Sequence, residues 1–464
     1  MILETLRNVW NQKYKDVPQQ LQKLQDISSV ATAFNTNIDA VIKISGEKLK
    51  KLIIENNIDL SSAQLTHFNK PEDAILGIFK CFTRGIAEEW VTEDIEVYHW
   101  LDKNLGYTHL QMGGQGGIIA NALALLGIKQ VVAHTNSHPR LQAEQFLDLD
   151  NLWGINSQGQ LQKAYEIERK DDIPLIHWII EFDKGDSFSI DKKTYTCPKS
   201  NRFIATYDPL NMNLVINDSF VSYMNRNKVQ YLLLSGFHPL LECNHGIDLI
   251  DNAVSVIKNW KENNPDLIIH LEIASTQDKV IRKAIIDKVS PFVQSAGLNE
   301  RETIDILEIL GESQLAQRIE KETSAVNLFD AVFLLKKRLN IPRIQLHMFG
   351  LYLTVQDERF PYSVEQNIKG MMTAAVVSSS KAYVGSLKKY ADVSATLDYP
   401  VSDIGLNEIM SLSEKLNKPE LAQNGFCTYD NFQISAVPTI LIDKPKTLVG
   451  MGDTISSVSL LAGR

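Results

Sequence analysis

The stretch VGMGDTI, residues 449–455, combines two glycines, an aspartate and the start of a helix near the C-terminus. It follows an apolar, β-rich run over 432–442 and opens a short C-terminal helix. Gly450 and Gly452 allow the backbone to approach a ligand closely, and the free N–H groups at a helix start favour an anion. Asp453 places a carboxylate beside that anion hole. A glycine-rich turn that simply caps a helix has the same pattern, so this stretch alone does not distinguish an anion site from an ordinary helix cap.

A phosphoryl-transfer site needs two things that this stretch offers. One is a base for the attacking hydroxyl, and the other is a set of donors for the charge that develops during transfer. Residues 450–453 combine a carboxylate with backbone amides in four consecutive positions. The stretch therefore predicts a phosphotransferase, provided that other site residues accompany it.

Composition limits the classes of protein to be considered. The chain has 464 residues, of which 44% are hydrophobic and 22% charged, as in an ordinary soluble globular protein. This length allows two or three domains, or one large core with an inserted module. The net charge of −9, from 56 acidic and 47 basic residues, argues against a nucleic-acid partner.

Cysteine usage and hydropathy predict a cytoplasmic protein. The four cysteines have no paired spacing, which indicates neither a zinc site nor a disulfide framework. The N-terminus lacks the apolar region of a signal peptide. No apolar run reaches the ~20 residues of a membrane span, so we expect no membrane partner.

Apolar strands alternate with helices along most of the chain, which predicts a mainly parallel sheet covered on both faces. The predicted strands are 28–34, 130–135, 231–235, 267–274, 292–298 and 432–442, with a strand pair or one bent strand over 344–354. The predicted helices are 1–24 (one helix or two), 118–126, 246–263, 278–289, 300–310, 326–339 and 363–382.

The texture changes to β-rich between residues 161 and 207. Residues 176–182 and 187–190 flank a turn at Lys184-Gly185 and predict a β-hairpin. Further strands are predicted at 194–197 and 202–206. A β-rich insertion in an α/β chain indicates a second module, which we interpret as a lid.

Polar residues follow the first predicted strand, and glycines open the next helix. Asn35, Asn37 and Asp39 lie just past residues 28–34, a place where α/β folds bind ligands, although an ordinary Asn/Asp turn has the same composition. Gly113–Gly117 reads GGQGG directly before the helix 118–126. These glycines would allow a ligand to lie close to the backbone, but they would equally fit a tight loop that binds nothing.

Two further segments carry acids at strand ends. His270 and Glu272 share one face of a strand, where a carboxylate is costly unless it is paired, so a buried ion pair is the alternative to a functional role. Asn299 and Glu302 have the spacing of a capping box and also offer oxygens to a hydrated magnesium ion. The two interpretations of Asn299 and Glu302 are compatible.

Two basic residues are weaker candidates. Arg202 begins a predicted lid strand and can clamp a phosphate bidentately if it faces a cleft, although most arginines face solvent. His347 ends the run RIQLH and could face a nucleotide, although such a histidine is more often simply hydrogen-bonded at a strand end.

Taken in order, these motifs resemble the ADP-dependent glucokinase/phosphofructokinase family of the ribokinase-like superfamily. The resemblance covers most of the chain, and its last block and the GLNERE block are the most diagnostic. The matching segments are FNTNIDAV (34–41), GGQGGIIAN (113–121), NRFI (201–204), LLSGF (233–237), HLEIAS (270–275), GLNERE (297–302) and VPTILIDKPKTLVGMGDTIS (437–456).

The resemblance implies a large Rossmann-like, ribokinase-like α/β domain with a central mostly parallel sheet, and a smaller β-containing lid domain. Residues 1–34, 111–160 and 208–464 would form the large nucleotide-binding domain. Residues 35–110 and 161–207 would form the lid on the sugar side.

The resemblance also assigns roles to individual residues. Asp453 would be the base, and Gly450, Met451 and Gly452 would form the anion hole. The sugar side would be lined by Asn35, Asn37, Asp39, Gly114 and Gln115, with Glu88 as a further carboxylate that disfavours a phosphorylated sugar. Arg202 would contact phosphate, and His347, Tyr352, Val437 and Pro438 would contact the nucleotide. Glu272, Asn299 and Glu302 would position Mg²⁺ and its waters.

The expected function is that of a magnesium-dependent sugar kinase that transfers the β-phosphoryl group of ADP to glucose or fructose 6-phosphate and releases AMP. We expect a monomer or a small homo-oligomer. The alternatives are an ATP-dependent kinase of the same superfamily and a non-catalytic sugar- or nucleotide-binding regulator. The chain departs from the family pattern at Gly116, usually alanine, and at SGFH, residues 235–238. NRFI is closer to the glucokinase branch, whereas GGQGGIIANALALLG is closer to the phosphofructokinase branch.

Overall fold

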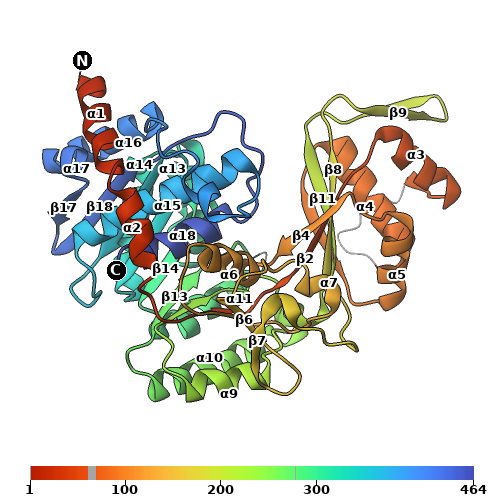
Figure 1. Ribbon diagram of the computed structural model, residues 1–464. Coiled ribbons are helices and arrows are strands. Elements are labelled where there is room, and N and C mark those ends of the chain that lie inside the picture. The colour runs from red at the N-terminus through yellow and green to blue at the C-terminus, as the bar shows by residue number, and fades with distance from the viewer. Residues whose placement is uncertain (1, 61–68, 277) are drawn as a thin grey trace.

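The structure is a computed structural model that describes residues 2–60, 69–276 and 278–464 (Figure 1). Over these residues the strands form an 11-stranded sheet, a five-stranded sheet and a two-stranded ribbon. The two larger sheets belong to separate hydrophobic cores. We call the part built on the 11-stranded sheet the large unit and the part built on the five-stranded sheet the small unit.

The sheet of the large unit is parallel in its centre and antiparallel at both edges. Neighbours from β6 to β15 run parallel, while β7 at one edge and β16, β18 and β17 at the other are antiparallel to their neighbours. In spatial order the strands are β17 (Phe426–Tyr429), β18 (Phe432–Pro438), β16 (Leu351–Gln356), β15 (Arg343–Met348), β14 (Ser295–Leu298), β13 (Ile268–Glu272), β12 (Tyr231–Leu234), β1 (Val30–Ala33), β5 (Val131–Ala133), β6 (Leu152–Ile155) and β7 (Leu161–Lys163).

Helices cover both faces of this sheet, as the apolar strands require. The predicted mainly parallel, doubly covered sheet is therefore confirmed. The helices that lie outside the small unit are α1 (Ile2–Tyr14), α2 (Val17–Leu24), α6 (Gln115–Leu125), α7 (Arg140–Ala143), α8 (Pro209–Met212), α9 (Asp218–Arg226), α10 (Gly246–Asn263), α11 (Lys279–Ala284), α12 (Glu300–Ile309), α13 (Ser313–Lys321), α14 (Ala325–Leu339), α15 (Val364–Val384), α16 (Asp403–Leu416), α17 (Pro419–Asn424) and α18 (Met451–Ala462).

The small unit is a sheet with helices on one face. Its strands, in spatial order, are β3 (Glu88–Thr92), β11 (Asn201–Tyr207), β8 (Ile176–Phe182), β2 (Asn37–Lys43) and β4 (His109–Gly113), and its helices are α3 (Gly46–Glu55), α4 (Pro71–Arg84) and α5 (Ile95–Asn104). Because side chains alternate along a strand, one face carries the core residues and the other carries Asp39, His177 and Thr206 in register. This second face is directed to the large unit, opposite α3–α5 (Figure 1).

The predicted hairpin over 176–190 is wrong. The turn at Lys184-Gly185 is present, but β8 pairs with β11 and β2, while β9 (Ser187–Ile190) pairs with β10 (Lys193–Thr196) in a separate ribbon. The physical reason lies in burial. The alternating apolar residues of β8 are buried in the core of the small unit, whereas the more polar β9 is half exposed.

Sheet membership also shifts two predicted boundaries. Residues 111–113 belong to β4 of the small sheet, and residues 161–163 belong to β7 of the large sheet. The segment after β1 is not only a polar turn, because β2 already begins at Asn37. Residue 1 and residues 61–68, which fall in the predicted domain ranges, lie outside the described residues.

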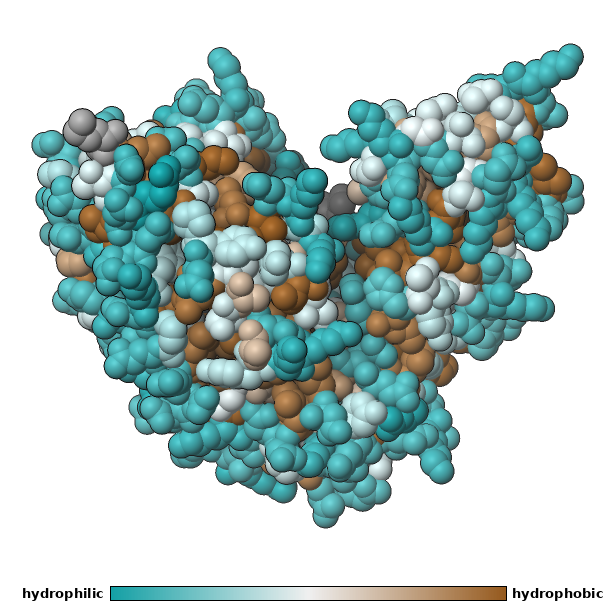
Figure 2. Space-filling model, turned by 45° about the horizontal axis from the view of Figure 1, so that its top comes forward, coloured by the Kyte–Doolittle hydropathy of each residue, from teal (hydrophilic) through white to brown (hydrophobic). Residues whose placement is uncertain are grey.

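A deep notch separates the two units in the space-filling view (Figure 2). None of the helices in the described residues combines the length and apolarity needed to cross a membrane. The strands β1, β12, β13, β14 and β15 all end with their carboxyl ends at one edge of the large sheet, because they are parallel. Ligand sites of open α/β sheets lie at that edge.

Candidate active site

A left-handed glycine starts the last helix. Gly450 precedes α18 and has φ +61°, a backbone conformation that L side chains rarely adopt. The first N–H groups of α18 have no partner within the helix, so this turn can bind an anion. Gly452 is equally constrained, because a Cβ there would lie 2.8 Å from His347 Nε2. The predicted anion-hole residues thus form a tight turn packed against β15.

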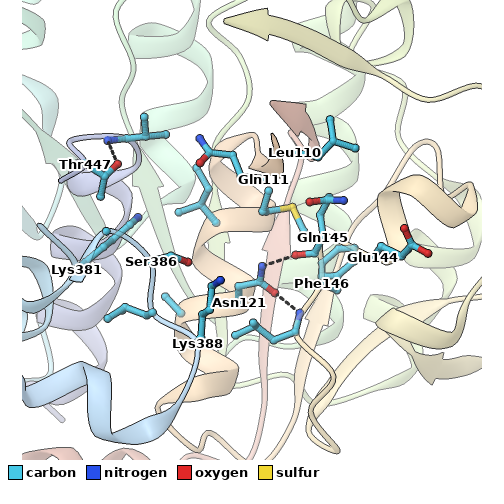
Figure 3. Close-up of a pocket in the computed structure, with 17 residues that line it drawn as sticks. Leu110, Gln111, Asn121, Glu144, Gln145, Phe146, Lys381, Ser386, Lys388 and Thr447 are labelled. Atoms are coloured by element: carbon cyan, nitrogen blue, oxygen red, sulfur yellow. Dashed lines mark hydrogen bonds between the residues drawn. The ribbon is translucent and has the colours of Figure 1, made fainter. Parts of the chain in front are cut away.

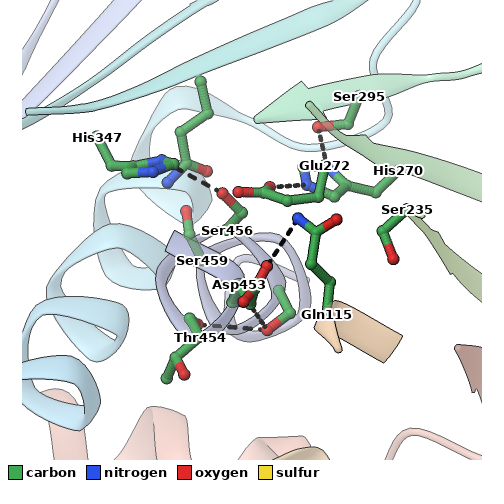
Figure 4. A network of polar contacts seen from close by, with 12 residues as sticks. Gln115, Ser235, His270, Glu272, Ser295, His347, Asp453, Thr454, Ser456 and Ser459 are labelled. Atoms are coloured by element: carbon green, nitrogen blue, oxygen red, sulfur yellow. Dashed lines mark hydrogen bonds and ion pairs between the residues drawn. The ribbon is translucent and has the colours of Figure 1, made fainter. Parts of the chain in front are cut away.

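Asp453 lies in the first turn of α18 and is only 8% exposed. Gln115, the first residue of α6, donates from Nε2 to Asp453 Oδ1 over 3.0 Å, so the starts of two helices meet at this carboxylate (Figure 4). Burial raises the pKa of Asp453, while the Gln115 hydrogen bond and the Lys381 charge lower it. A carboxylate with a raised pKa is a better proton acceptor than one in water.

Two further acids lie close to Asp453. Burial raises the pKa of Glu272 well above its usual range, and the charges of Asp453 and Glu302 add to that. Burial also raises the pKa of Glu302 to about 8, with repulsion from Asp453 among the further causes. Three buried acids from β13, α12 and α18 that repel one another favour a bound cation between them.

Asn299 and Glu302 form the predicted capping box. Asn299 N donates to Glu302 Oε2 over 2.7 Å, and Glu302 N donates to Asn299 Oδ1 over 3.0 Å. In the described residues no three His, Cys, Asp or Glu side chains are arranged to ligate a metal directly. Magnesium commonly keeps several waters and takes only one or two protein carboxylates, so Glu272 and Glu302 together with the Asn299 amide fit such an ion.

A hydrogen-bonded chain fixes Glu272 from behind (Figure 4). Arg343 donates to Ser295 Oγ over 2.9 Å, and Ser295 Oγ lies 2.9 Å from His270 Nδ1. Arginine can only donate, so Ser295 can donate to Nδ1, which leaves the Nε2 proton of His270 for Glu272 at 3.2 Å. Burial lowers the pKa of His270 to about 3, which keeps the ring neutral.

Asn35, Asn37 and Asp39 gather at the junction of the two units. Asn37 Nδ2 donates to Asn35 Oδ1 over 3.2 Å and to Asp208 Oδ2 over 3.3 Å. Burial raises the pKa of Asp39 to about 6, against the lowering effect of His177. Gly114 has φ +71°, and a Cβ there would lie 2.7 Å from the Asn35 carbonyl oxygen. The glycine at position 114 is therefore needed for the close approach of the Asn35 backbone, and not only for a ligand.

A cavity of about 530 Å³ opens between the units beside these residues. His177 Nε2 lies 3.1 Å from Asp208 Oδ2, and Thr206 Oγ1 donates to Glu89 Oε1 over 2.7 Å. Burial lowers the pKa of His177, but Asp208, Glu89 and Asp39 together raise it to about 9. The residues that line the cavity include Asn35, Glu89, Glu93, His177, Thr206, Asp208, Asn211 and His238.

Sequence reasoning named only Asn35 among these lining residues. Glu89, His177, Asp208 and His238 come from four separate segments, and no local motif joins them. Glu88 was the predicted sugar-side carboxylate, and the structure corrects this. Glu88 accepts from Lys80 Nζ over 2.9 Å and from Trp90 Nε1 over 2.8 Å on the covered face of β3, so its neighbour Glu89 faces the cavity instead.

Of the four residues predicted to contact the nucleotide, His347 lies beside the glycine turn, whereas Tyr352, Val437 and Pro438 lie in the core. His347 is buried beside Gly452, at the turn that precedes α18. Tyr352 is buried and its hydroxyl lies 3.0 Å from Ser378 Oγ, and Val437 is fully buried beside it. The Pro438 carbonyl accepts from Tyr14 over 2.7 Å. Tyr352, Val437 and Pro438 therefore contribute to the core and offer no exposed surface to a base.

Arg202 does not line the cavity. It is exposed near one end of β11, opposite Glu181 on β8, and borders a separate surface depression. It does lie on the same face of the small sheet as Thr206, and its charge contributes to lowering the pKa of Asp39. Its contact with a phosphate stays a prediction.

A second cavity, of about 310 Å³, lies against α6, whose Ile118, Asn121 and Ala122 line it (Figure 3). It brings Leu110 and Gln111 of the small unit close to Asn121, Lys381 and Val449 of the large unit. Val449, directly before the glycine turn, borders this cavity, and Glu272 of β13 lies beside Gly452 within the turn.

The match to a family of known proteins extends over nearly the whole chain. The family described as "ADP-specific Phosphofructokinase/Glucokinase conserved region" matches residues 28–462. An ADP-specific phosphofructokinase of Methanosarcina acetivorans is 28% identical over 98% of this chain and 96% of its own length. An ADP-dependent glucose/glucosamine kinase of Pyrococcus abyssi is 30% identical over 98% of each chain.

Solved structures agree with this match. The last common ancestor of ADP-dependent phosphofructokinases from Methanosarcinales superposes with a TM-score of 0.85 at 30% identity, over 100% of this chain and 99% of that one. An ADP-dependent kinase in complex with fructose-6-phosphate and ADPbetaS has a TM-score of 0.81 at 30% identity, over 98% and 97%. The chain belongs to the ADP-specific phosphofructokinase/glucokinase family.

Proposed function

We propose that the protein is an ADP-dependent sugar kinase that transfers the β-phosphoryl group of ADP to a hexose hydroxyl and releases AMP. The observation that carries the proposal is the buried Asp453 carboxylate at the start of α18, hydrogen-bonded to Gln115 and directly after the glycine turn. The names of the relatives supply the donor, and the cavity between the units supplies a place for the acceptor.

The reaction follows from this arrangement. The sugar hydroxyl gives its proton to the Asp453 carboxylate, and its oxygen forms a bond to the β-phosphorus of ADP. The bond from that phosphorus to the bridging oxygen breaks, and AMP leaves with the electron pair. The N–H groups of Met451, Gly452 and Asp453 stabilise the charge on the transferred group.

Glu272, Asn299 and Glu302 would hold Mg²⁺ through its waters. When bound, the ion would neutralise negative charge on the phosphates. The support is the chemistry of the donors, namely two buried carboxylates with raised pKa and an amide oxygen near the phosphate turn. The His270 hydrogen bond orients Glu272 for this purpose.

The charges around the larger cavity favour an uncharged hexose as acceptor. Its described lining contains Glu89, Glu93 and Asp208 but no lysine or arginine. The raised pKa of His177 makes it a cation in this lining, but it is already paired with Asp208 over 3.1 Å. A sugar phosphate would therefore place its negative charge among these acids without a free cation, whereas the hydroxyls of glucose can donate to them. We therefore propose glucose, rather than fructose 6-phosphate, as the better substrate.

The turn between β15 and β16 is the proposed site for the nucleotide base. Phe349 is 65% exposed at the carboxyl end of β15, two residues after His347. Ile404 is 46% exposed and packs against Gly350 of the same turn. An adenine ring can lie on such exposed apolar groups, which Tyr352 and Val437 do not provide.

The test is AMP release by the purified protein with ADP or ATP as donor and glucose or fructose 6-phosphate as acceptor, with magnesium present. We expect AMP from ADP and glucose. Turnover with ATP but not ADP would refute the proposed donor, and turnover with fructose 6-phosphate alone would refute the proposed acceptor. Ligand-induced thermal stabilisation without any turnover on a broad sugar panel would favour a regulator instead.

A further inference from the structure

Lys381, near the end of α15, contacts the back of the glycine turn. Its Nζ donates to the Gly450 carbonyl oxygen over 3.0 Å and to Thr454 Oγ1 over 3.2 Å. Thr454 Oγ1 in turn donates to the same carbonyl over 2.8 Å. The three groups form a closed triangle around one carbonyl oxygen, built from α15 and α18, which pack along each other.

This lysine has no acidic partner of its own. Within the described part of the chain its hydrogen-bond partners are both neutral, and no carboxylate lies within ion-pair distance of its Nζ. Burial lowers the pKa of Lys381 to about 8, and only the charge of Asp453 opposes this effect. Because a half-buried ammonium group without a counter-ion is costly, an anion at the turn would stabilise it.

The peptide geometry shows what the contact does. The Gly450 carbonyl and the Met451 N–H belong to one planar trans peptide and point in opposite directions. A carbonyl held toward Lys381 therefore directs the Met451 N–H away from Lys381. The same carbonyl also accepts the first backbone hydrogen bond of α18, from Thr454 N over 3.2 Å, so Lys381 strengthens a hold that the helix itself begins. The added contact matters at Gly450, because glycine has no Cβ to restrict its backbone.

We propose that Lys381 is a positioning residue for phosphoryl transfer, which clamps the glycine turn so that its N–H groups face the transferred phosphoryl group. This proposal rests on the proposed function. The ammonium group also places a positive charge behind the turn, next to the developing negative charge. Nothing in the sequence motif 449–455 indicates this partner, which lies about 70 residues earlier in the chain.

Four variants test the role. Lys381→Met keeps the bulk and removes the charge and both hydrogen bonds, whereas Lys381→Arg keeps a cation. Thr454→Val removes one side of the triangle but leaves the lysine. The matched control is Lys388→Met, because Lys388 lines the same 310 Å³ cavity as Lys381 without a hydrogen bond to the turn (Figure 3).

Steady-state kinetics are the first measurement. We expect Lys381→Met to lower kcat about tenfold to a hundredfold while the KM for sugar changes less than threefold, in line with the loss of part of an anion hole. Lys381→Arg should recover most of kcat, Thr454→Val should lie between it and Lys381→Met, and Lys388→Met should match the wild type. Wild-type kcat in Lys381→Met would overturn the proposal.

A binding measurement separates this inference from the proposed function. By calorimetry, Lys381→Met should weaken ADP at least tenfold but AMP less than threefold, because only ADP carries the group that reaches the turn. Equal weakening of ADP and AMP, or no recovery in Lys381→Arg, would show a merely structural role. If wild type has no kinase activity, the proposed function fails, and the ratio of ADP to AMP affinity still decides the role of Lys381. If Lys381→Met does not fold, Thr454→Val and Lys381→Arg decide it.

Discussion

At the scale of the residue, the central feature is a carboxylate whose charge is poorly compensated. Asp453 has one neutral donor, Gln115, and one nearby cation, Lys381, while Glu272 and Glu302 lie close enough to be repelled by it. Such a group accepts a proton readily and gains by the arrival of cationic or proton-donating ligands. The base role of Asp453 can be tested directly.

Asp453→Asn should lower kcat by about 10²- to 10⁴-fold, because the amide cannot accept the hydroxyl proton. The amide is nearly isosteric with the carboxyl group, so ADP and sugar should still bind with affinities within about threefold of wild type. The measurement is turnover of AMP together with calorimetric binding of each ligand. Near-normal turnover would remove Asp453 from the base role.

Two adjacent glutamates provide a matched pair. Glu89→Gln should raise the KM for sugar at least tenfold, because Glu89 faces the cavity, while the melting temperature changes little. Glu88→Gln should leave the KM for sugar unchanged and lower the melting temperature, because Lys80, which is buried, loses its ion pair. The opposite pattern would mean that β3 presents its other face to the sugar.

At the scale of the element, the start of α18 is positioned by its neighbours rather than by itself. Lys381 of α15 holds the turn from one side, Gln115 of α6 holds the carboxylate, and His347 of β15 packs against Gly452. The turn between β15 and β16 lies at the carboxyl ends of the parallel strands, on the same side. This position is why we propose the β15–β16 turn as the support for the nucleotide.

Phe349→Ala should raise the KM for ADP about five- to tenfold with a smaller effect on kcat, because the exposed ring is proposed to cover one face of the adenine. Sugar affinity should not change. Ile54→Ala is the control, since Ile54 is 56% exposed on α3 of the small unit, away from the proposed nucleotide site. An unchanged KM for ADP in Phe349→Ala would place the base elsewhere.

At the scale of the whole molecule, the two units face each other across the notch of Figure 2. Side chains of the small sheet, such as His177 and Glu89, and of the large unit, such as His238, line one cavity. Phosphoryl transfer that avoids hydrolysis requires water to be excluded, which closure of the small unit as a lid would achieve. Small-angle scattering should therefore show a smaller radius of gyration with glucose and AMP together than without ligand. An unchanged radius would argue against closure.

The buried histidines of the large unit should make the whole molecule sensitive to acid. Burial lowers the pKa of His134 to about 4 and that of His138 to about 3. The unfolded chain therefore binds protons below about pH 6.5 that the folded chain excludes, so the stabilising contribution is present above that pH and is lost as the pH falls. For each histidine, the free energy of unfolding should fall by about 1.4 kcal/mol for each pH unit of acidification between the pKa of the unfolded chain and that of the folded chain.

His134→Gln should make the free energy of unfolding less dependent on pH between about pH 4.5 and 6. The number of protons taken up on unfolding should fall by close to one. The ring is fixed in its neutral form, because Nδ1 lies 2.9 Å from the Phe34 carbonyl oxygen and Nε2 accepts from Asn217 N over 3.0 Å. Urea titrations at several pH values measure this slope. Parallel curves for variant and wild type would contradict it.

Much of the fold followed from local patterns. The central apolar strands and most of the long helices of the large unit were predicted near their observed positions, and Gly246–Asn263 matches the predicted helix at both ends. The helices α9, α13, α16 and α17 and the edge strands β6, β7 and β17 were not predicted. Local periodicity determines such elements because each buries one stripe or face. The predicted hairpin failed because strand pairing is not local. The partner of β8 lies on β11 and β2, and no turn residue specifies that choice.

The sequence by itself determined the groups to which the proposed chemistry is assigned, because the turn 449–455, the capping box at Asn299 and the glycines before α6 are each complete within a few residues. Only the tertiary structure decided which side chains share the cavity. Glu89 faces it and Glu88 does not, since a strand presents alternate residues to opposite faces and only its place in the sheet decides which face is open. Lys381, His177 and Asp208 reach the site from distant segments, and packing alone brings them there.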